Sequence, residues 1–154
     1  MGVLDNWGDG TITRDVIDTM VGEHGRGGRH HGGGFYEYGE DGSKAIWPGL
    51  MDLYFNADAS VAEDDMKDRL LFRQVIEALK CLETNVLRTV ADGNIGSIMG
   101  IGAPAWTGGL IQFVNTYGLE RFSARCAELA NQYGDRFDAP AIVGEKIAAG
   151  ETFA

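Results

Sequence analysis

The chain has 154 residues, and 23 aspartates and glutamates against 13 lysines and arginines give it a formal net charge of −10. With 44% hydrophobic and 23% charged residues it has the composition of one globular domain, which excludes disordered, collagen-like and coiled-coil chains. The negative charge disfavours binding to nucleic acid and to anionic membrane surfaces.

The N-terminal region is acidic. Residues 1–20 contain four aspartates and a single basic residue, Arg14. This is the reverse of a signal peptide, which has a basic start and an apolar middle. No stretch of the sequence approaches the ~18 apolar residues that a membrane span needs. These features predict a cytoplasmic protein that does not enter a membrane.

An amphipathic helix is expected over residues 11–24, because apolar residues recur there at helical spacing. They are Ile12, Val16, Ile17, Met20 and Val21. A helix this short cannot bury its apolar stripe alone. It either packs on the later part of the chain or belongs to another domain, and we favour the second: residues 1–24 are expected to be the last helix of a preceding helical domain that is mostly absent from this chain.

Residues 25–59 are expected to form a linker. Seven of the 23 glycines lie between Gly22 and Gly34, where neither helix nor strand is favoured. The same stretch holds the basic cluster of the chain: His24, Arg26, Arg29, His30 and His31. A metal site is conceivable, but adjacent histidines diverge and the glycines leave their geometry unspecified. A solvated, mobile linker is the favoured interpretation.

Aromatic residues dominate the second half of this linker. They stand on both sides of a turn predicted at residues 40–43, and Pro48 is placed to begin a helix. The aromatic residues are Phe35, Tyr36, Tyr38 and Trp47. We expect their burial to hold the segment in place with little regular structure.

A long helix is predicted from residue 60 onward. Ser60 and Glu63 match a capping box, and two oppositely charged pairs follow at a spacing of four, Glu63 with Lys67 and Asp65 with Arg69. Apolar residues on one face and charged residues on the other predict about seven turns. The apolar set is Leu71, Val75, Ala78, Leu79, Leu82 and Val86, and the charged set is Arg69, Arg73, Glu77 and Lys80.

Six glycines between Gly93 and Gly109 predict a tight corner between helices. Residues 100–105 resemble a GxGxxA dinucleotide fingerprint, with Glu120 downstream. That motif requires a strand before it and helix amides after it, and Pro104 has no amide proton, so a structural corner is favoured over nicotinamide binding. The corner, with Trp106 packed beneath it, comprises Gly100, Gly102, Pro104, Trp106, Gly108 and Gly109.

Two further helices complete the prediction. One covers residues 119–133 and ends at Gly134, and a short one runs from Pro140 to Gly150. The first has an apolar stripe of Phe122, Cys126, Leu129, Ala130 and Tyr133, and the second has Ile142, Val143 and Ile147. No useful β alternation is present, so the predicted class is all-α, with residues 60–154 as a helical C-terminal domain.

No catalytic motif is visible in the sequence. GxSxG, P-loop and HExxH patterns are absent. Cys81 and Cys126 lack metal-site spacing and are expected to be reduced, buried thiols. The carboxylate pairs Asp64/Asp65 and Glu120/Glu128 are explained by charged helix surfaces.

Several segments together resemble the fatty-acid β-oxidation multifunctional enzyme. The segment 28–38 and the Trp-Pro-Gly-Leu at 47–50 are similar to its linker, with Arg29, Gly32, Gly34, Phe35, Tyr36 and Tyr38 as the linker motif. Segments 68–74, 91–109 and 133–137 look like the second C-terminal domain of its L-3-hydroxyacyl-CoA dehydrogenase part. His30 and Ala103 depart from the lysine and phenylalanine usual in the family, which alters one charge and one packing contact.

The resemblance implies a parent enzyme that oxidises 3-hydroxyacyl-CoA to 3-ketoacyl-CoA with NAD. Its catalytic histidine and glutamate lie in the nicotinamide-binding domain, and an assisting asparagine lies in the first C-terminal domain. No segment of this chain matches their surroundings. We therefore expect no catalytic, cofactor-binding or metal-binding residue here, and no activity of this chain alone.

The expected role is structural: the domain braces the NAD-binding and first C-terminal domains of the parent, and self-associates when isolated from them. An alternative is an independent interaction module that docks thiolase or another β-oxidation protein. A third reading is a small metalloenzyme using His24, His30 and His31.

Overall fold

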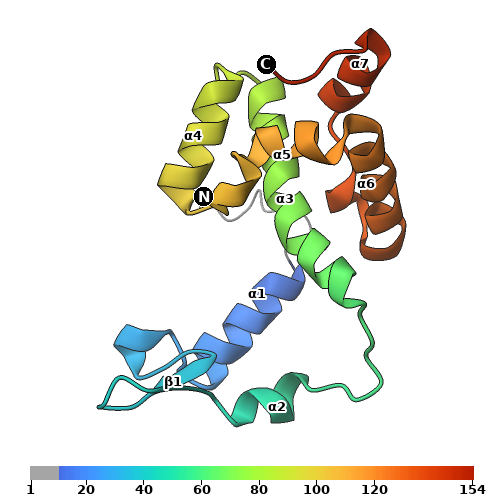
Figure 1. Ribbon diagram of the computed structural model, residues 1–154. Coiled ribbons are helices and arrows are strands. Elements are labelled where there is room, and N and C mark those ends of the chain that lie inside the picture. Colours follow the sequence, from blue (N-terminus) through green and yellow to red (C-terminus); the bar gives the residue numbers. More distant parts are fainter. Residues whose placement is uncertain (1–10) are drawn as a thin grey trace. The chain divides into compact units, whose positions relative to one another are not determined.

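The computed structural model describes residues 11–154, which divide into two compact units (Figure 1). Unit 1 is Met1–Ser60, described from residue 11, and unit 2 is Val61–Ala154. The assignment of residues 1–24 to a preceding domain remains a prediction.

Unit 1 begins with helix, as expected for residues 11–24. The α-helix α1 (Thr11–Ile17) continues directly into the π-helical turn η2 (Asp18–Glu23). Met20 is buried, whereas Ile17 and Val21 are about half exposed. The predicted stripe is therefore only partly covered.

The glycine-rich loop is tied together by Arg26, and the expected mobility of the linker stays a prediction. Its Nε donates to the Gly34 carbonyl at 2.6 Å and its Nη2 donates to the Tyr36 carbonyl at 3.2 Å. The guanidinium also lies 4.4 Å from the ring centre of Trp47. A backbone bridge joins Gly28 and Gly33 around the 3-10 turn η3 (Arg29–His31).

The aromatic half of unit 1 contains a small β-hairpin that the sequence analysis missed. β1 (Tyr36–Tyr38) pairs antiparallel with β2 (Lys44–Ile46) across the predicted turn. Each strand has three residues and both faces are exposed, so there is no alternation to detect. Contrary to expectation, Phe35, Tyr36 and Tyr38 are exposed rather than buried. The helix expected after Pro48 is α2 (Gly49–Tyr54).

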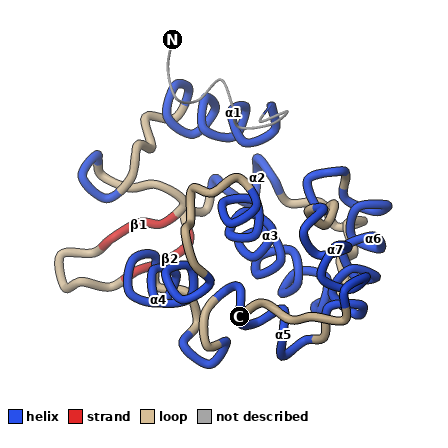
Figure 2. The backbone as a smooth tube through the Cα atoms, turned by 90° about the horizontal axis from the view of Figure 1, so that it is seen from above, coloured by secondary structure: helices blue, strands red, loops and turns tan. Residues whose placement is uncertain are grey.

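Unit 2 is built around one long helix, α3 (Glu63–Glu83). Within this unit α4 lies on one side of α3, and α6 and α7 lie on the other (Figures 1 and 2). The remaining elements are α4 (Val90–Ile101), η4 (Ala105–Thr107), α5 (Leu110–Tyr117), α6 (Leu119–Tyr133), η5 (Asp135–Phe137) and α7 (Ala141–Ala149). The all-α class is confirmed. No helix in residues 11–154 is long and apolar enough to cross a membrane.

The start and end of α3 differ from the prediction. The helix begins at Glu63 with Ala62 before it and no side-chain cap, so the Ser60 capping box does not form. The Glu63–Lys67 ion pair is present at 2.7 Å. The helix stops at Glu83, two residues before Asn85, which adopts a left-handed φ of 60°. Val86 therefore lies beyond the helix and is exposed, not on its apolar face.

The core of unit 2 forms where α3, α5 and α6 meet. Phe72 of α3 stacks on Phe122 of α6 at 4.8 Å between ring centres and meets Phe113 and Tyr117 of α5 edge-on. The predicted stripe of α6 is confirmed, and Gly134 and Gly150 end α6 and α7 with positive φ. The buried cluster is Phe72, Val75, Ile76, Leu79, Ala103, Leu110, Ile111, Phe113, Val114, Leu119, Phe122, Cys126, Leu129, Phe137, Val143 and Phe153.

The second glycine-rich segment is largely helical, which corrects the expected corner. Gly93, Gly96 and Gly100 lie inside the 12-residue helix α4. The turn between helices is confined to Gly102–Gly109. Trp106 is 74% exposed, so it does not pack beneath this turn.

Candidate functional site

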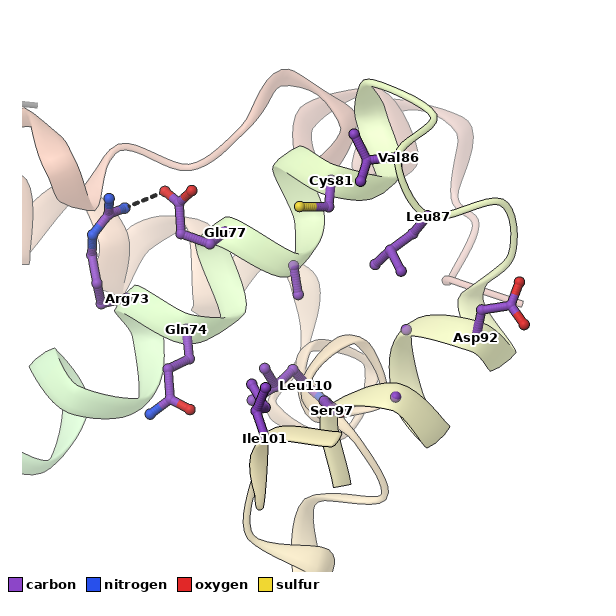
Figure 3. A pocket seen from close by; sticks show the side chains of 13 residues that line it. Arg73, Gln74, Glu77, Cys81, Val86, Leu87, Asp92, Ser97, Ile101 and Leu110 are labelled. Carbon is purple, nitrogen blue, oxygen red and sulfur yellow. Dashed lines mark hydrogen bonds and ion pairs between the residues drawn. The ribbon is translucent and has the colours of Figure 1, made fainter. Parts of the chain in front are cut away.

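An apolar groove of about 480 Å³ lies in unit 2 between α3 and α4 (Figure 3). Arg73 and Gln74 stand at one end and Asp92 at the other in this view. Its lining residues are Arg73, Gln74, Glu77, Ala78, Cys81, Val86, Leu87, Asp92, Gly93, Gly96, Ser97, Ile101 and Leu110.

Two glycines of α4, Gly93 and Gly96, line the groove. A Cβ atom added at Gly96 or Gly100 would meet nothing within 4 Å, so the helix backbone is open to an incoming surface at both positions. At Gly93 a Cβ would instead meet Cδ1 of Ile111 at 2.5 Å. Gly93 therefore serves the packing of α5, whereas Gly96 and Gly100 leave space.

Two polar side chains of α4 hold the start of α5 in place. Asn94 Oδ1 accepts hydrogen bonds from the amides of Ile111, at 3.1 Å, and Gln112, at 2.9 Å. Ser97 Oγ accepts from the Leu110 amide at 3.2 Å. The first three amides of α5 are thus satisfied by its neighbour, which removes the usual cost of a buried helix N-terminus.

Two charged groups that line the groove, Arg73 and Glu77, are paired with each other. Arg73 Nη1 lies 2.6 Å from Glu77 Oε1 and donates to the Arg136 carbonyl at 3.1 Å. Lys80 approaches the same Glu77 oxygen at 3.3 Å. The lining contains no histidine, and its one thiol, Cys81, is half-buried. This arrangement suits contact with an apolar surface and offers no histidine for proton transfer.

A second polar cluster joins α6 to the first half of α3. Arg125 bonds Asp65, Asp68 at 2.7 Å and Glu128 at 2.9 Å, and Tyr133 donates its hydroxyl to Asp65 at 2.7 Å. The hydrogen bonds from Tyr133 and Arg125 lower the pKa of Asp65. The bond to Asp65 raises the pKa of Tyr133. The expected Asp65–Arg69 pair is replaced by this cluster.

Arg69 has another partner. Its guanidinium lies 4.2 Å from the ring centre of Tyr133.

The other thiol, Cys126, is fully buried in the core, and burial raises its pKa to about 12. The expectation of buried thiols therefore holds for Cys126 but not for Cys81, which lines the groove.

The predicted corner residues lie at the junction of α4, η4 and α5. Gly102 ends α4 with φ 70°, and Gly108 and Gly109 turn the chain into α5 with positive φ. The ring of Trp106 meets the ring of Phe113 edge-on, with 6.3 Å between the ring centres.

The groove between α3 and α4 was not predicted from the sequence. The four-residue spacing of Gly96 and Gly100 was the available signal, but it has meaning only once residues 90–101 are known to be helical.

The predicted linker-motif residues lie in unit 1. Arg29 lies 5.2 Å from the ring centre of Tyr38, and Lys44 lies 3.7 Å from that of Tyr36. His24, His30 and His31 are exposed. Within residues 11–154, no group of three or more His, Cys, Asp or Glu side chains is arranged to hold a metal ion.

Comparison with known proteins confirms the resemblance drawn from the motifs. The chain is 33% identical over 126 residues to the fatty acid oxidation complex subunit alpha of Vibrio campbellii, one of 183 curated proteins that match. The alignment covers 80% of this chain and 17% of that relative. The chain thus spans about a sixth of the relative's length. No protein-family profile matches the chain.

Proposed function

We propose that this chain is a helical C-terminal domain of a fatty-acid β-oxidation enzyme and that its role is to brace the domains that carry the chemistry. The 33% identity over most of this chain, against 17% of the alpha subunit, is the observation that carries the proposal. The parent reaction is the NAD-dependent oxidation of 3-hydroxyacyl-CoA to 3-ketoacyl-CoA, and NAD belongs to the parent rather than to this chain.

The chemistry of the described residues agrees with a bracing role. Hydride transfer needs a nucleotide site and a base within hydrogen-bond reach of the substrate hydroxyl. The groove is lined mainly by aliphatic side chains and glycine and has no histidine. The packed core of α3, α5 and α6 instead keeps the outer surface of the domain in a fixed shape, and that surface can contact a neighbouring domain. The expected partners are the NAD-binding and first C-terminal domains.

The test is complementation. The relative's alpha subunit is truncated to remove the segment aligned with this chain, and NADH formation from a 3-hydroxyacyl-CoA is followed with and without the purified chain. We expect no turnover by the chain alone and recovery of dehydrogenase activity on mixing. Turnover by the chain alone, or micromolar NAD binding to it in calorimetry, would contradict the proposal.

A second candidate function is an independent docking module for thiolase. The large apolar side chains exposed on unit 2, such as Met99 and Trp106, favour some protein contact. Immobilised chain should then retain a purified β-oxidation thiolase in the absence of any dehydrogenase domain. If the chain retains no thiolase, the bracing role is left as the single candidate.

A further inference from the structure

We propose that the open edge of strand β2 in unit 1 binds an extended acidic peptide, which adds to the β1–β2 hairpin as a third strand. The surface that receives the peptide consists of β2 (Lys44–Ile46), the two tyrosines of β1 and Arg29 beside them. The inference goes beyond the proposed function, because it assigns a binding role to unit 1, which contributes nothing to the large buried core.

The backbone of β2 has an unpaired edge, and this is the first observation. The Trp47 amide donates to the Phe35 carbonyl at 2.9 Å, which fixes the residues of the hairpin that are hydrogen-bonded to each other. By that alternation Ala45 is bonded to β1, whereas the amides and carbonyls of Lys44 and Ile46 point away from it. Within the described part of unit 1 these outward groups have no hydrogen-bond partner. Such an edge is a template for another strand.

The opposite edge of the hairpin, on β1, is occupied where the strand begins. The Tyr36 carbonyl, which points outward there, accepts hydrogen bonds from the Gly34 amide at 3.0 Å and from Arg26 Nη2 at 3.2 Å. The glycine-rich loop therefore satisfies the β1 edge with groups of its own. An incoming strand is directed to β2.

One face of the hairpin carries aromatic rings and cations. In the register of the two strands Tyr36 lies opposite Ile46. Tyr38 lies opposite Lys44, and residues directly opposite each other project to the same side of a sheet. Lys44 Nζ lies 3.7 Å from the ring centre of Tyr36, and the Arg29 guanidinium lies 5.2 Å from that of Tyr38. All of these side chains are exposed, and tyrosine and arginine are enriched at protein contact sites.

The charge of this face selects an acidic partner. Glu37 supplies the one carboxylate within the two strands, and it projects to the opposite face, where its Oε1 lies 3.7 Å from Arg26 Nη1. The other carboxylates of the hairpin, Glu40 and Asp41, lie in the turn. A second copy of the chain is disfavoured, because pairing two β2 edges would bring their lysines close together. A strand with a carboxylate opposite Lys44 forms an ion pair instead.

The probe is a fluorescein-labelled peptide that repeats glutamate, threonine, valine and threonine. Alternate residues of a strand share a face, so a glutamate can meet Lys44 while the valine two residues away meets Ile46. Binding to the full chain is followed by fluorescence anisotropy, and we expect a dissociation constant of about 100 µM. Two control peptides should bind about tenfold more weakly or worse: one with lysine in place of glutamate, and one with alternate amides N-methylated, which keeps the charge but cannot pair as a strand.

Two substitutions on β2 test the charge and the backbone edge. Lys44→Glu reverses the charge, and Ile46→Pro removes an amide that points away from β1, so the hairpin keeps its own hydrogen bonds. Arg88→Glu is the matched control, because it is an equal charge reversal at an exposed residue of unit 2. Each β2 variant should raise the dissociation constant of the glutamate peptide about tenfold or more, and the control should leave it within about twofold. The Lys44→Glu variant should prefer the lysine peptide.

Amide hydrogen exchange, measured by NMR, gives an independent readout. The glutamate peptide should slow the exchange of the Lys44 and Ile46 amides, which point outward in the free chain. The Ala45 amide is already bonded to β1 and should change little. Its protection in each variant also establishes that the hairpin persists.

Failure of the glutamate peptide to bind overturns the inference, as does equal binding of all three peptides or binding that leaves both outward amides unprotected. Dimerisation of the chain that Ile46→Pro abolishes also overturns it, because a second copy then takes the edge. None of these results touches the proposed function, which stands or fails on turnover and complementation. Conversely, turnover by the chain alone removes the proposed function without changing peptide binding.

Discussion

The connection between α4 and α5 depends on one glycine. Gly109 has φ +111°, a conformation that L-residues with a side chain rarely adopt, and an added Cβ would collide with the Cα and Cβ atoms of Asn94. Asn94 cannot withdraw, because its side chain holds the amides of α5. Backbone conformation and close contact therefore both require glycine at this position.

Replacing Gly109 with alanine should lower the free energy of unfolding by about 2–4 kcal/mol, from strain and overpacking together. Gly144→Ala is the matched control, because Gly144 lies in α7 with no atom within 4 Å of an added Cβ. It should be neutral or stabilise by up to about 1 kcal/mol. Urea denaturation of both variants checks the prediction, and equal stabilities would refute it.

Asn94 should be replaceable by aspartate but not by alanine. Alanine leaves the amides of Ile111 and Gln112 without their acceptor, at a cost of about 1–3 kcal/mol. Aspartate keeps the acceptor oxygen and adds negative charge near a helix N-terminus, so it should remain within about 1 kcal/mol of wild type. Thermal unfolding followed by circular dichroism distinguishes the two. If both variants lose the same stability, the side chain fills space instead of capping α5.

At the scale of elements, predictability from sequence follows the strength of the helical period. α3, α6 and α7 were predictable because apolar residues recur on one face of each, and glycine or proline marks the ends of α6 and α7. α4 was not predictable, because its three glycines, Gly93, Gly96 and Gly100, give it the composition of a loop. The helix is supported instead by packing of Gly93 against Ile111 and by a Thr89 side-chain cap on the Asp92 amide. Tertiary contacts override the low helix propensity of glycine here.

The groove could not be predicted from the sequence for the same reason, because one of its two walls is α4. The glycines and Trp106 were predicted to form a tight corner, because the helical character of residues 90–101 was not visible in the sequence. The groove also depends on Cys81 and Leu87, which are distant from the glycines in sequence and adjoin them only in the fold. A pattern on one helix cannot reveal a surface made by two.

The contact between α3 and α6 should be sensitive to acid through Asp65. Its pKa is lowered below the ordinary 3.8, so the stabilising interaction is complete above pH 3.8 and is lost as pH falls through the lower folded-state value. Asp65→Asn should therefore destabilise at about pH 6, and the difference from wild type should shrink at about pH 3.5. Asp64→Asn, the same charge change at an exposed neighbour, should not show this trend in urea midpoints. A difference independent of pH would refute the assignment.

The end of the chain is fastened to α5 by Asn115. Its Nδ2 donates to the Phe153 carbonyl at 2.8 Å and its Oδ1 accepts from the Phe153 amide at 3.0 Å, while the Phe153 ring is buried in the core. Phe153→Ala should cost about 3–5 kcal/mol of unfolding free energy. Thr152→Ala, at an exposed neighbour, should leave the denaturation midpoint unchanged. A loss of less than about 1 kcal/mol would show that the tail contributes little to the core.

At the scale of the whole molecule, the two units are stabilised by different kinds of contact. Unit 1 is held by Arg26, by cation–π contacts and by a hairpin of two three-residue strands, and its aromatic side chains remain largely exposed. Every residue of the large buried cluster lies in unit 2, between Phe72 and Phe153. Because apolar burial is the dominant favourable term in folding, unit 2 should hold most of the stability.

Unit 2 should therefore fold when separated from unit 1. Residues 55–62 are exposed and connect α2 to α3, and Phe55 is 66% exposed, so chymotrypsin should cut there first. A chain of residues 61–154 should keep its helical circular dichroism and unfold cooperatively near the temperature of the full chain. A matched chain of residues 1–60 should show no comparable cooperative transition, since it lacks the cluster that drives burial. Loss of the transition in residues 61–154 would mean that unit 1 supplies stability that its visible contacts do not explain.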